Sequence, residues 1–148
     1  MIVLICLALL VVTTVIHYEI LRGLSASLPS IGIPARVKLI FVIFGTFLAH
    51  TLEIILYALA ILLMSHHLGW GTLGGVEKVT FKVCMYFSAE TFTSLGFGDV
   101  IPHGGLRLLS GAEALNGLLL IGWSASYIYI TMERFWIEDV KNGKYAGQ

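Results

Sequence analysis

Charged side chains are scarce in this sequence. Only 12% of its 148 residues are Asp, Glu, Lys or Arg, against about a quarter in a typical soluble domain, whereas 57% are hydrophobic. The basic and acidic residues balance to a formal net charge of zero, so no excess positive charge is available to bind nucleic acid. A water-soluble fold and a nucleic-acid partner are therefore not expected.

Cysteines and linker-type segments are also few. Cys6 and Cys84 both lie in apolar surroundings and fit neither a disulfide framework nor the spacing of a metal site. No tract rich in Pro, Gly or Ser and no internal repeat divides the chain. We expect one folded unit without a cofactor.

What the sequence does contain is three long apolar stretches, at residues 2–21, 37–64 and 106–132. About 20 apolar residues in a helix cross a hydrocarbon core of about 30 Å, so each stretch is long enough to span a bilayer. The first stretch has an alternative interpretation as a signal peptide, with Ser25-Ala26-Ser27 as a loose cleavage site, but no positive charge precedes it. The pattern predicts an all-α membrane protein with three transmembrane helices.

A fourth apolar segment, residues 79–93, is shorter. As a helix it would extend only about 22 Å, too little to cross a bilayer. A glycine-bearing loop and then a full span follow it, which predicts a re-entrant helix that enters the membrane and returns. Non-helical backbone at that depth must be buried in protein or line a water-filled cavity, so this segment indicates a pathway.

The loop after this short segment has the composition needed to bind a dehydrated cation. Replacing a cation's hydration shell requires oxygens held at short range, and rings of backbone carbonyls can supply them. A row of carbonyls facing one way needs alternating backbone conformations. Glycine adopts positive φ cheaply, and Gly96 and Gly98 flank Phe97 at this alternation. Ser94 adds a hydroxyl oxygen, and the C-terminal end of the preceding helix dipole favours a cation.

The ten residues from Glu90 to Asp99, ETFTSLGFGD, followed by Pro102, resemble the pore signature of potassium channels. The resemblance extends from about Arg36 to Phe135, in the order outer helix, pore helix, selectivity filter and inner helix. It implies a homotetramer around a central pore that conducts K⁺ passively, and it implies no enzymatic activity.

The resemblance also implies roles for particular residues. The filter would consist of Thr93, Ser94, Leu95, Gly96, Phe97 and Gly98. The ion would bind the main-chain oxygens of Ser94, Leu95, Gly96 and Phe97, together with the Ser94 hydroxyl. Residues that would support the filter are the carboxyl pair Glu90 and Asp99, often sharing a proton, and the aromatic cuff of Tyr86 and Phe87. Gly117 matches the inner-helix glycine often regarded as a gating hinge.

Several positions depart from the commonest potassium-channel pattern. Phe97 replaces a tyrosine whose hydroxyl braces the filter, and Phe87 replaces a tryptophan. Ser94 and Leu95 replace threonine and valine but leave the backbone ligands in place. These changes keep open a second function, a weakly selective Na⁺/K⁺ channel on the same pore. A third, a small membrane enzyme or redox subunit, would leave the filter-like segment unexplained.

Polar residues inside the spans are the remaining candidates. Thr46, His50, Glu53 and Tyr57 are spaced to share one helical stripe, and the third span carries Glu113 and Asn116. One interpretation is a satisfied hydrogen-bond network between helices. The other makes gating candidates of His50, Glu53, Glu113 and Asn116, together with Gly117, and puts His50, Glu53 and Glu113 in a titratable contact between outer and inner helices. A metal site at His50 and Glu53 has two ligands where three are normally needed.

His17 and Glu19, near the inner end of the first span, are expected at the membrane interface. No span carries the repeated arginines of a voltage sensor, so a voltage-driven gate is not expected. The opening stimulus and any regulatory partner are not identified by the sequence.

Basic residues near the span ends predict the orientation. The side expected in the cytoplasm carries Arg22, Arg36, Lys38, Arg134, Lys141 and Lys144, whereas the other carries Lys78, Lys82 and Arg107. The N-terminus is then outside and the C-terminus inside, in the plasma membrane. We expect three parts: an extra helix and loop (residues 1–35), a pore domain (36–135) and a short cytoplasmic tail (136–148).

Overall fold

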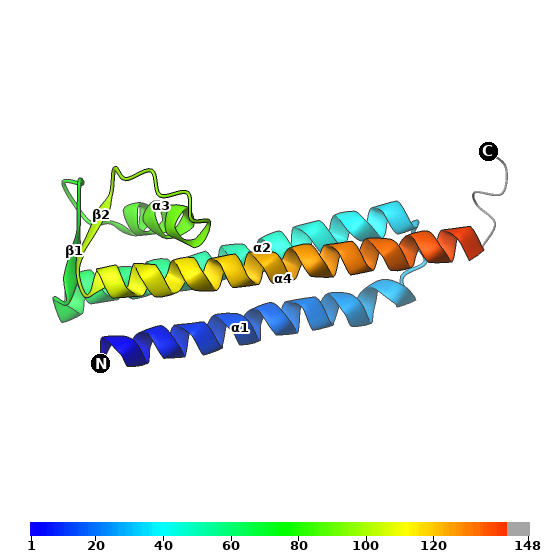
Figure 1. The fold of residues 1–148 in the computed structure, drawn as a ribbon, viewed down its shortest axis with the longest axis horizontal. Coiled ribbons are helices and arrows are strands. Elements are labelled where there is room, and N and C mark those ends of the chain that lie inside the picture. The colour runs from blue at the N-terminus through cyan, green and yellow to red at the C-terminus, as the bar shows by residue number, and fades with distance from the viewer. Residues whose placement is uncertain (142–148) are drawn as a thin grey trace.

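Three long helices form an elongated bundle in the computed structural model, which describes residues 1–141 (Figure 1). They are α1 (Ile2–Ser27), α2 (Ala35–Leu63) and α4 (Leu106–Lys141). Each is long and apolar enough to cross a membrane. The predicted three spans and the mostly helical fold are therefore confirmed. Lys144 and residues 142–148 of the predicted tail lie outside the described residues.

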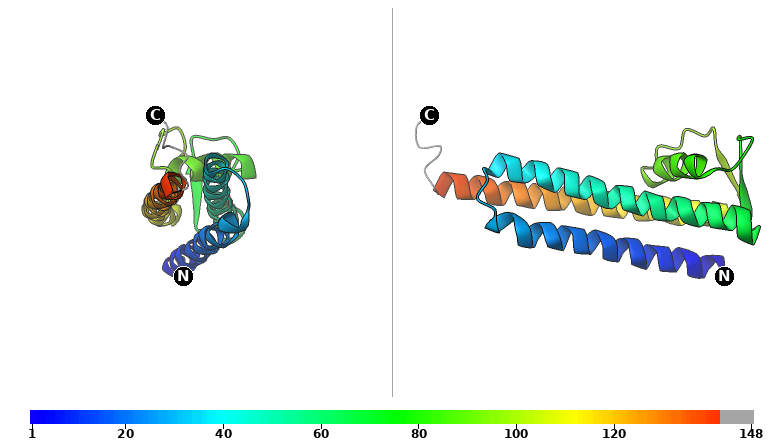
Figure 2. Two further views of the ribbon diagram at one scale, coloured as in Figure 1. Left: turned by 90° about the vertical axis from the view of Figure 1, so that its right-hand side faces the viewer. Right: turned by 180° about the vertical axis from the view of Figure 1, so that it is seen from behind.

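The bundle helices alternate in direction, and α1 and α2 join at the end remote from the N-terminus (Figure 2). A 3-10 turn, Leu28–Ser30, ends α1, and Pro34 precedes α2, where its fixed φ suits the start of a helix. At its other end α2 runs into a π-helical turn, Met64–Leu68, which Gly69 ends with a φ of 61°. The chain then stays at the N-terminal end of the bundle until α4 begins.

The short helix α3 (Phe81–Phe92) lies at that same end and packs against α2 and α4 (Figure 2). Thr80 begins it, because the Thr80 hydroxyl oxygen accepts a hydrogen bond of 3.3 Å from the Val83 N–H. Twelve residues make a helix about 18 Å long, which cannot cross a bilayer core of about 30 Å. The predicted short helix is present, with each end within two residues of its expected place.

A small antiparallel sheet was not predicted. Strands β1 (Gly71–Gly74) and β2 (Ile101–Gly104) pair with Gly71 opposite Gly104 and Gly74 opposite Ile101. Four-residue strands rich in glycine carry no alternating pattern, so the sequence reads as loop there. Glycine is required at Gly75 because its φ is 85° and a Cβ would lie 2.0 Å from the Asp99 carbonyl oxygen. The sheet therefore joins the segment before α3 to the segment after the filter loop.

The hydrophobic core lies where α3 meets the bundle. Phe87 and Phe92 of α3 are buried together with Tyr57 and Ile61 of α2 and Leu109 of α4. Elsewhere the bundle surface is apolar, and its exposed side chains include Phe41, Phe44 and Phe47 on α2. A surface of this kind suits lipid or further protein rather than water. The core thus fixes α3, and with it the loop that follows, against two long helices.

Candidate functional site

The loop from Thr93 to Asp99 has an alternating backbone. Positive φ angles occur at every second residue: 58° at Ser94, 56° at Gly96 and 81° at Gly98. Within residues 1–141, Ser94 is the only residue other than glycine with positive φ. The sequence predicted the two glycines in this conformation but not Ser94. Alternation of this kind lets successive carbonyl oxygens face one side of the chain, as cation coordination requires.

The loop is exposed, and so are its apolar side chains. Leu95 is 63% and Phe97 67% exposed, although both adjoin a well-packed helix. Apolar side chains that cluster on an exposed loop are typical of a surface that another molecule covers.

Glu90, in the last turn of α3, holds this loop from behind. Its side chain is almost fully buried, and its Oε2 accepts a hydrogen bond of 3.1 Å from the Phe97 N–H. Its backbone carbonyl accepts hydrogen bonds from the N–H groups of Leu95 at 2.9 Å and Gly96 at 3.3 Å. One residue therefore accepts hydrogen bonds from three successive amide groups of the loop.

Asp99 has a different partner. The Tyr86 hydroxyl donates to the Asp99 carboxylate, at 3.2 Å from Oδ1 and 3.0 Å from Oδ2. Desolvation and this hydrogen bond both raise the pKa of the Tyr86 phenol above its usual value, so the hydroxyl keeps its proton and donates. Glu90 and Asp99 were expected to share a proton, but each bonds elsewhere: Glu90 to the Phe97 amide and Asp99 to Tyr86.

The two expected cuff residues lie in different surroundings. Tyr86 stacks on Phe97, with ring centroids 6.3 Å apart and planes 9° from parallel. Phe87 is buried in the hydrophobic core instead. Tyr86 therefore stacks on a residue of the loop, whereas Phe87 packs in the core below it.

Gly117 lies in the first half of α4, against Phe92 at the end of α3. The helix is continuous through this position, and a Cβ there would lie only 2.0 Å from the Phe92 carbonyl oxygen. The residue expected to act as a hinge therefore also serves as a packing point. It lets α4 approach the residue just before the loop.

The polar residues predicted inside the spans do not form one continuous group. Glu113 of α4 is fully buried and its Oε1 shares a hydrogen bond with the Ser88 hydroxyl of α3, whose oxygen also lies 3.0 Å from the Ile54 carbonyl oxygen of α2. Asn116 Nδ2 donates to the Thr13 hydroxyl at 2.8 Å and to the Tyr57 hydroxyl at 3.1 Å. These bonds link α4 to α1, α2 and α3, which supports the network interpretation.

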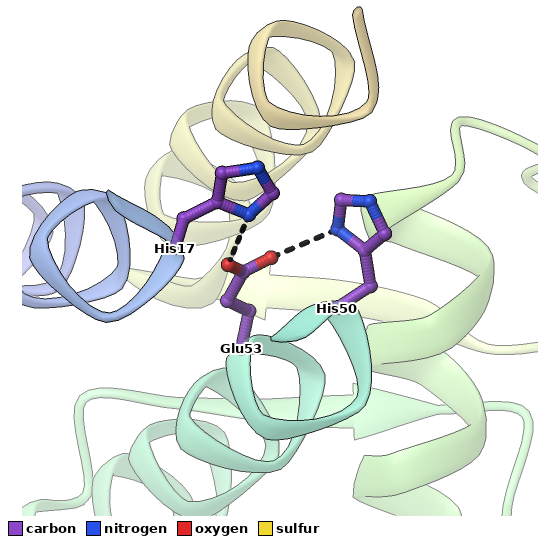
Figure 3. A group of neighbouring side chains, drawn as sticks. All are labelled: His17, His50 and Glu53. Atoms are coloured by element: carbon purple, nitrogen blue, oxygen red, sulfur yellow. Dashed lines mark hydrogen bonds and ion pairs between the residues drawn. The ribbon is translucent and has the colours of Figure 1, made fainter. Parts of the chain in front are cut away.

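His50 and Glu53 form a group with His17, a partner that the sequence did not predict. Figure 3 shows Glu53 between two histidines: His17 Nδ1 lies 2.9 Å from Oε1 and His50 Nδ1 lies 3.0 Å from Oε2. His17, predicted at the interface, is fully buried, so that prediction is wrong. The expected contact of His50 and Glu53 with Glu113 is replaced by a contact with α1. One sequence feature could have indicated that His17 is buried: it lies four residues after Thr13, so the two polar residues share one face of the first span.

A short helix, an alternating exposed loop and two flanking apolar helices together define the pore module of an ion channel. A family model described as an ion channel, a two-span potassium-channel pore family, matches residues 37–134. This match covers about two thirds of the chain, so the chain belongs to that family of ion channels and not to a family of enzymes. No curated protein and no solved structure matches it.

Proposed function

We propose that this chain is one of four identical subunits of a channel that selects potassium. The observation that carries the proposal is the Thr93–Asp99 loop, exposed and with positive φ at Ser94, Gly96 and Gly98. K⁺ would bind to the main-chain oxygens of residues 94–97, with the Ser94 hydroxyl at the inner end. Glu90 supports this proposal because it occupies the amide side of the loop and leaves the carbonyl side for the ion.

Four copies are proposed because one loop cannot surround an ion. Cyclic homo-oligomers close such rings, and Leu95 and Phe97 would then be covered by neighbouring subunits. The exposed apolar side chains of α4, among them Leu115, Leu118 and Leu119, supply further surface for contacts between subunits or with lipid. Residues 36–135 would be the pore domain, and residues 1–35 an added helix.

The proposed orientation places α3 and the loop at the outer face of the plasma membrane. Arg22, Arg36 and Lys38 lie at or near the α1–α2 connection, and the positive-inside rule assigns that end to the cytoplasm. The N-terminus and the loop lie at the opposite end of the bundle. α3 would therefore be re-entrant from outside, entering and leaving on one side.

The test is the reversal potential of purified protein in a planar bilayer, with K⁺ on one side and Na⁺ on the other. A potential near the K⁺ limit, with current blocked by Ba²⁺, is the expected result. Bilayers without protein give the background. A protein-dependent current that reverses near zero would refute potassium selectivity.

One observation favours a second candidate, a weakly selective Na⁺/K⁺ channel. Phe97 has no hydroxyl, so its side chain makes no hydrogen bond that would fix the width of the filter. Its contact within the chain is the stacked ring of Tyr86. This candidate predicts the near-zero reversal potential in the same experiment.

Removing the Tyr86 hydroxyl is expected to weaken the filter without closing the pore. Tyr86→Phe keeps the stacked ring but deletes the hydrogen bond to Asp99. Single-channel records should show shorter conducting periods than those of the wild type. The control is Tyr129→Phe, since Tyr129 is exposed on α4. Equal effects of the two changes would show that the Tyr86–Asp99 bond does not support conduction.

A further inference from the structure

Three side chains with metal-binding atoms converge inside the bundle, away from the filter loop. His17 from α1 and His50 and Glu53 from α2 each offer one ligand atom, and these atoms all lie within 4.8 Å of one another (Figure 3). His17 and Glu53 are fully buried and His50 is partly buried. Two imidazoles and one carboxylate are a donor set that suits Zn²⁺ and other divalent transition metals, not Mg²⁺ or Ca²⁺.

The distances are close to those of an assembled site. The Nδ1 atoms of His17 and His50 lie 2.9 and 3.0 Å from the two oxygens of Glu53. Ligands at about 2.0–2.2 Å from a tetrahedral ion are separated by roughly 3.3 Å. Each of these two N–O pairs would therefore open by a few tenths of an ångström, and the three ligand atoms, which lie within 4.8 Å of one another, would have to draw together around the ion.

The other nitrogen of each ring is also positioned. Ser124 Oγ of α4 lies 3.2 Å from His17 Nε2 and 3.0 Å from His50 Nε2. When both Nδ1 atoms bind a metal, both Nε2 atoms carry hydrogen, and one hydroxyl oxygen can accept both bonds. Hydrogen bonds from the second ring nitrogen are what normally fix the orientation of metal-binding histidines.

The charge of the cluster also favours a cation. A carboxylate among apolar helices needs a compensating charge, and the nearest side chains to Glu53 are the two histidines. An imidazolium or a divalent ion would satisfy this need equally, so electrostatics alone does not choose between them. The convergence of one atom from each of three residues, with the remaining nitrogens held by Ser124, favours the metal.

We propose that His17, His50 and Glu53 bind one divalent transition-metal ion of the Zn²⁺ type per chain. The site is separate from the proposed K⁺ pathway and does not depend on it. It ties α1, which lies outside the family match, to α2, which lies inside it. The His50 ring also lies 5.7 Å from the ring of Phe92, the last residue of α3. One ligand of the proposed site therefore lies beside the helix that leads into the filter loop.

The experiment is titration of chelator-treated purified protein with Co²⁺, followed by its visible absorption bands, and then displacement by Zn²⁺. Wild type is expected to bind one ion per chain, with the strong bands of a four-coordinate ion. His17→Gln should bind at least about 100-fold more weakly, since losing a ligand costs more than the 10–100-fold typical of outer partners. Ser124→Ala, which keeps all three ligands, should bind about tenfold more weakly.

The matched control is His67→Gln, because His67 is an exposed histidine of the π-helical turn that follows α2. It should bind Co²⁺ as wild type does. A wild-type protein that binds no Co²⁺ or Zn²⁺ at millimolar metal overturns the proposal and leaves an imidazolium as the compensating charge. Equal losses in His17→Gln and His67→Gln also overturn it.

A second measurement does not depend on the folding of any variant. X-ray absorption at the zinc edge of wild-type protein loaded with one equivalent of Zn²⁺ should show two imidazole ligands and oxygen. Fewer than two imidazoles would contradict the assigned ligand set even if metal binds. Neither experiment measures ion conduction, so failure here is distinguishable from failure of the proposed channel function.

Discussion

Gly117→Ala is expected to abolish the correctly assembled protein. The added Cβ would lie 2.0 Å from the carbonyl oxygen of Phe92 and 2.8 Å from its carbonyl carbon, and backbone atoms at a helix end cannot move aside as a side-chain tip can. α3 and α4 must separate, at a cost of about 3 kcal/mol or more. Size-exclusion chromatography in detergent should show loss of the assembled species, and thermal unfolding should begin roughly 10 °C lower.

Two other glycines of the same helix are matched controls for this change. A Cβ at Gly111 or Gly122 would meet no atom of the chain within 4 Å, so Gly111→Ala and Gly122→Ala should be neutral or slightly stabilising. If Gly117 acts only as a hinge, Gly117→Ala will assemble like these controls and differ only in open probability. That outcome would contradict the packing interpretation.

Glu90→Leu is expected to abolish conduction. The change leaves the Phe97 N–H without its acceptor on α3 and removes the side-chain support of the loop. Because the carbonyl row depends on that amide pointing toward α3, the loop should lose its alternating conformation. Current per reconstituted protein in a planar bilayer should fall at least tenfold, which corresponds to a free-energy change of about 1.4 kcal/mol.

Glu90→Gln is the control, because its carbonyl oxygen can still accept from the Phe97 N–H. It should conduct at a substantial fraction of the wild-type level. The backbone carbonyl of Glu90, which accepts from Leu95 and Gly96, is unchanged in both variants, so the comparison isolates the side chain. Loss of current in both would show that the negative charge of Glu90, and not its hydrogen bond, is what matters.

Features that depend on local composition could be predicted from the sequence. The three spans follow from apolar length alone, and the short helix from its being too brief to cross. Gly96 and Gly98 were expected at positive φ because few other residues adopt that conformation at low cost. The helical stripe from Thr46 to Tyr57 followed from the period of the helix, since all its members turned out to be at least partly buried.

Features that depend on contacts between distant segments could not be predicted. His17 reads as interfacial because it stands near a span end with Glu19, and only the packing of α1 on α2 brings it to Glu53. The β1–β2 pair joins segments about 30 residues apart through glycine-rich strands without a pattern. Ser94 takes a conformation that its side chain does not favour, because the bonds from Glu90 to the next two amides hold the turn in place.

The pairing of β1 with β2 bears on the thermodynamics of assembly. Residues 75–100, which include α3 and the whole Thr93–Asp99 loop, form a closed loop whose ends are joined within a single chain. Most of the conformational entropy of that loop is lost when one chain folds, before any second chain arrives. The affinity between subunits is lowered by the entropy cost of ordering loops and side chains that are still mobile when the subunits meet. In the proposed tetramer, each chain would therefore present a largely preorganised loop to its neighbours.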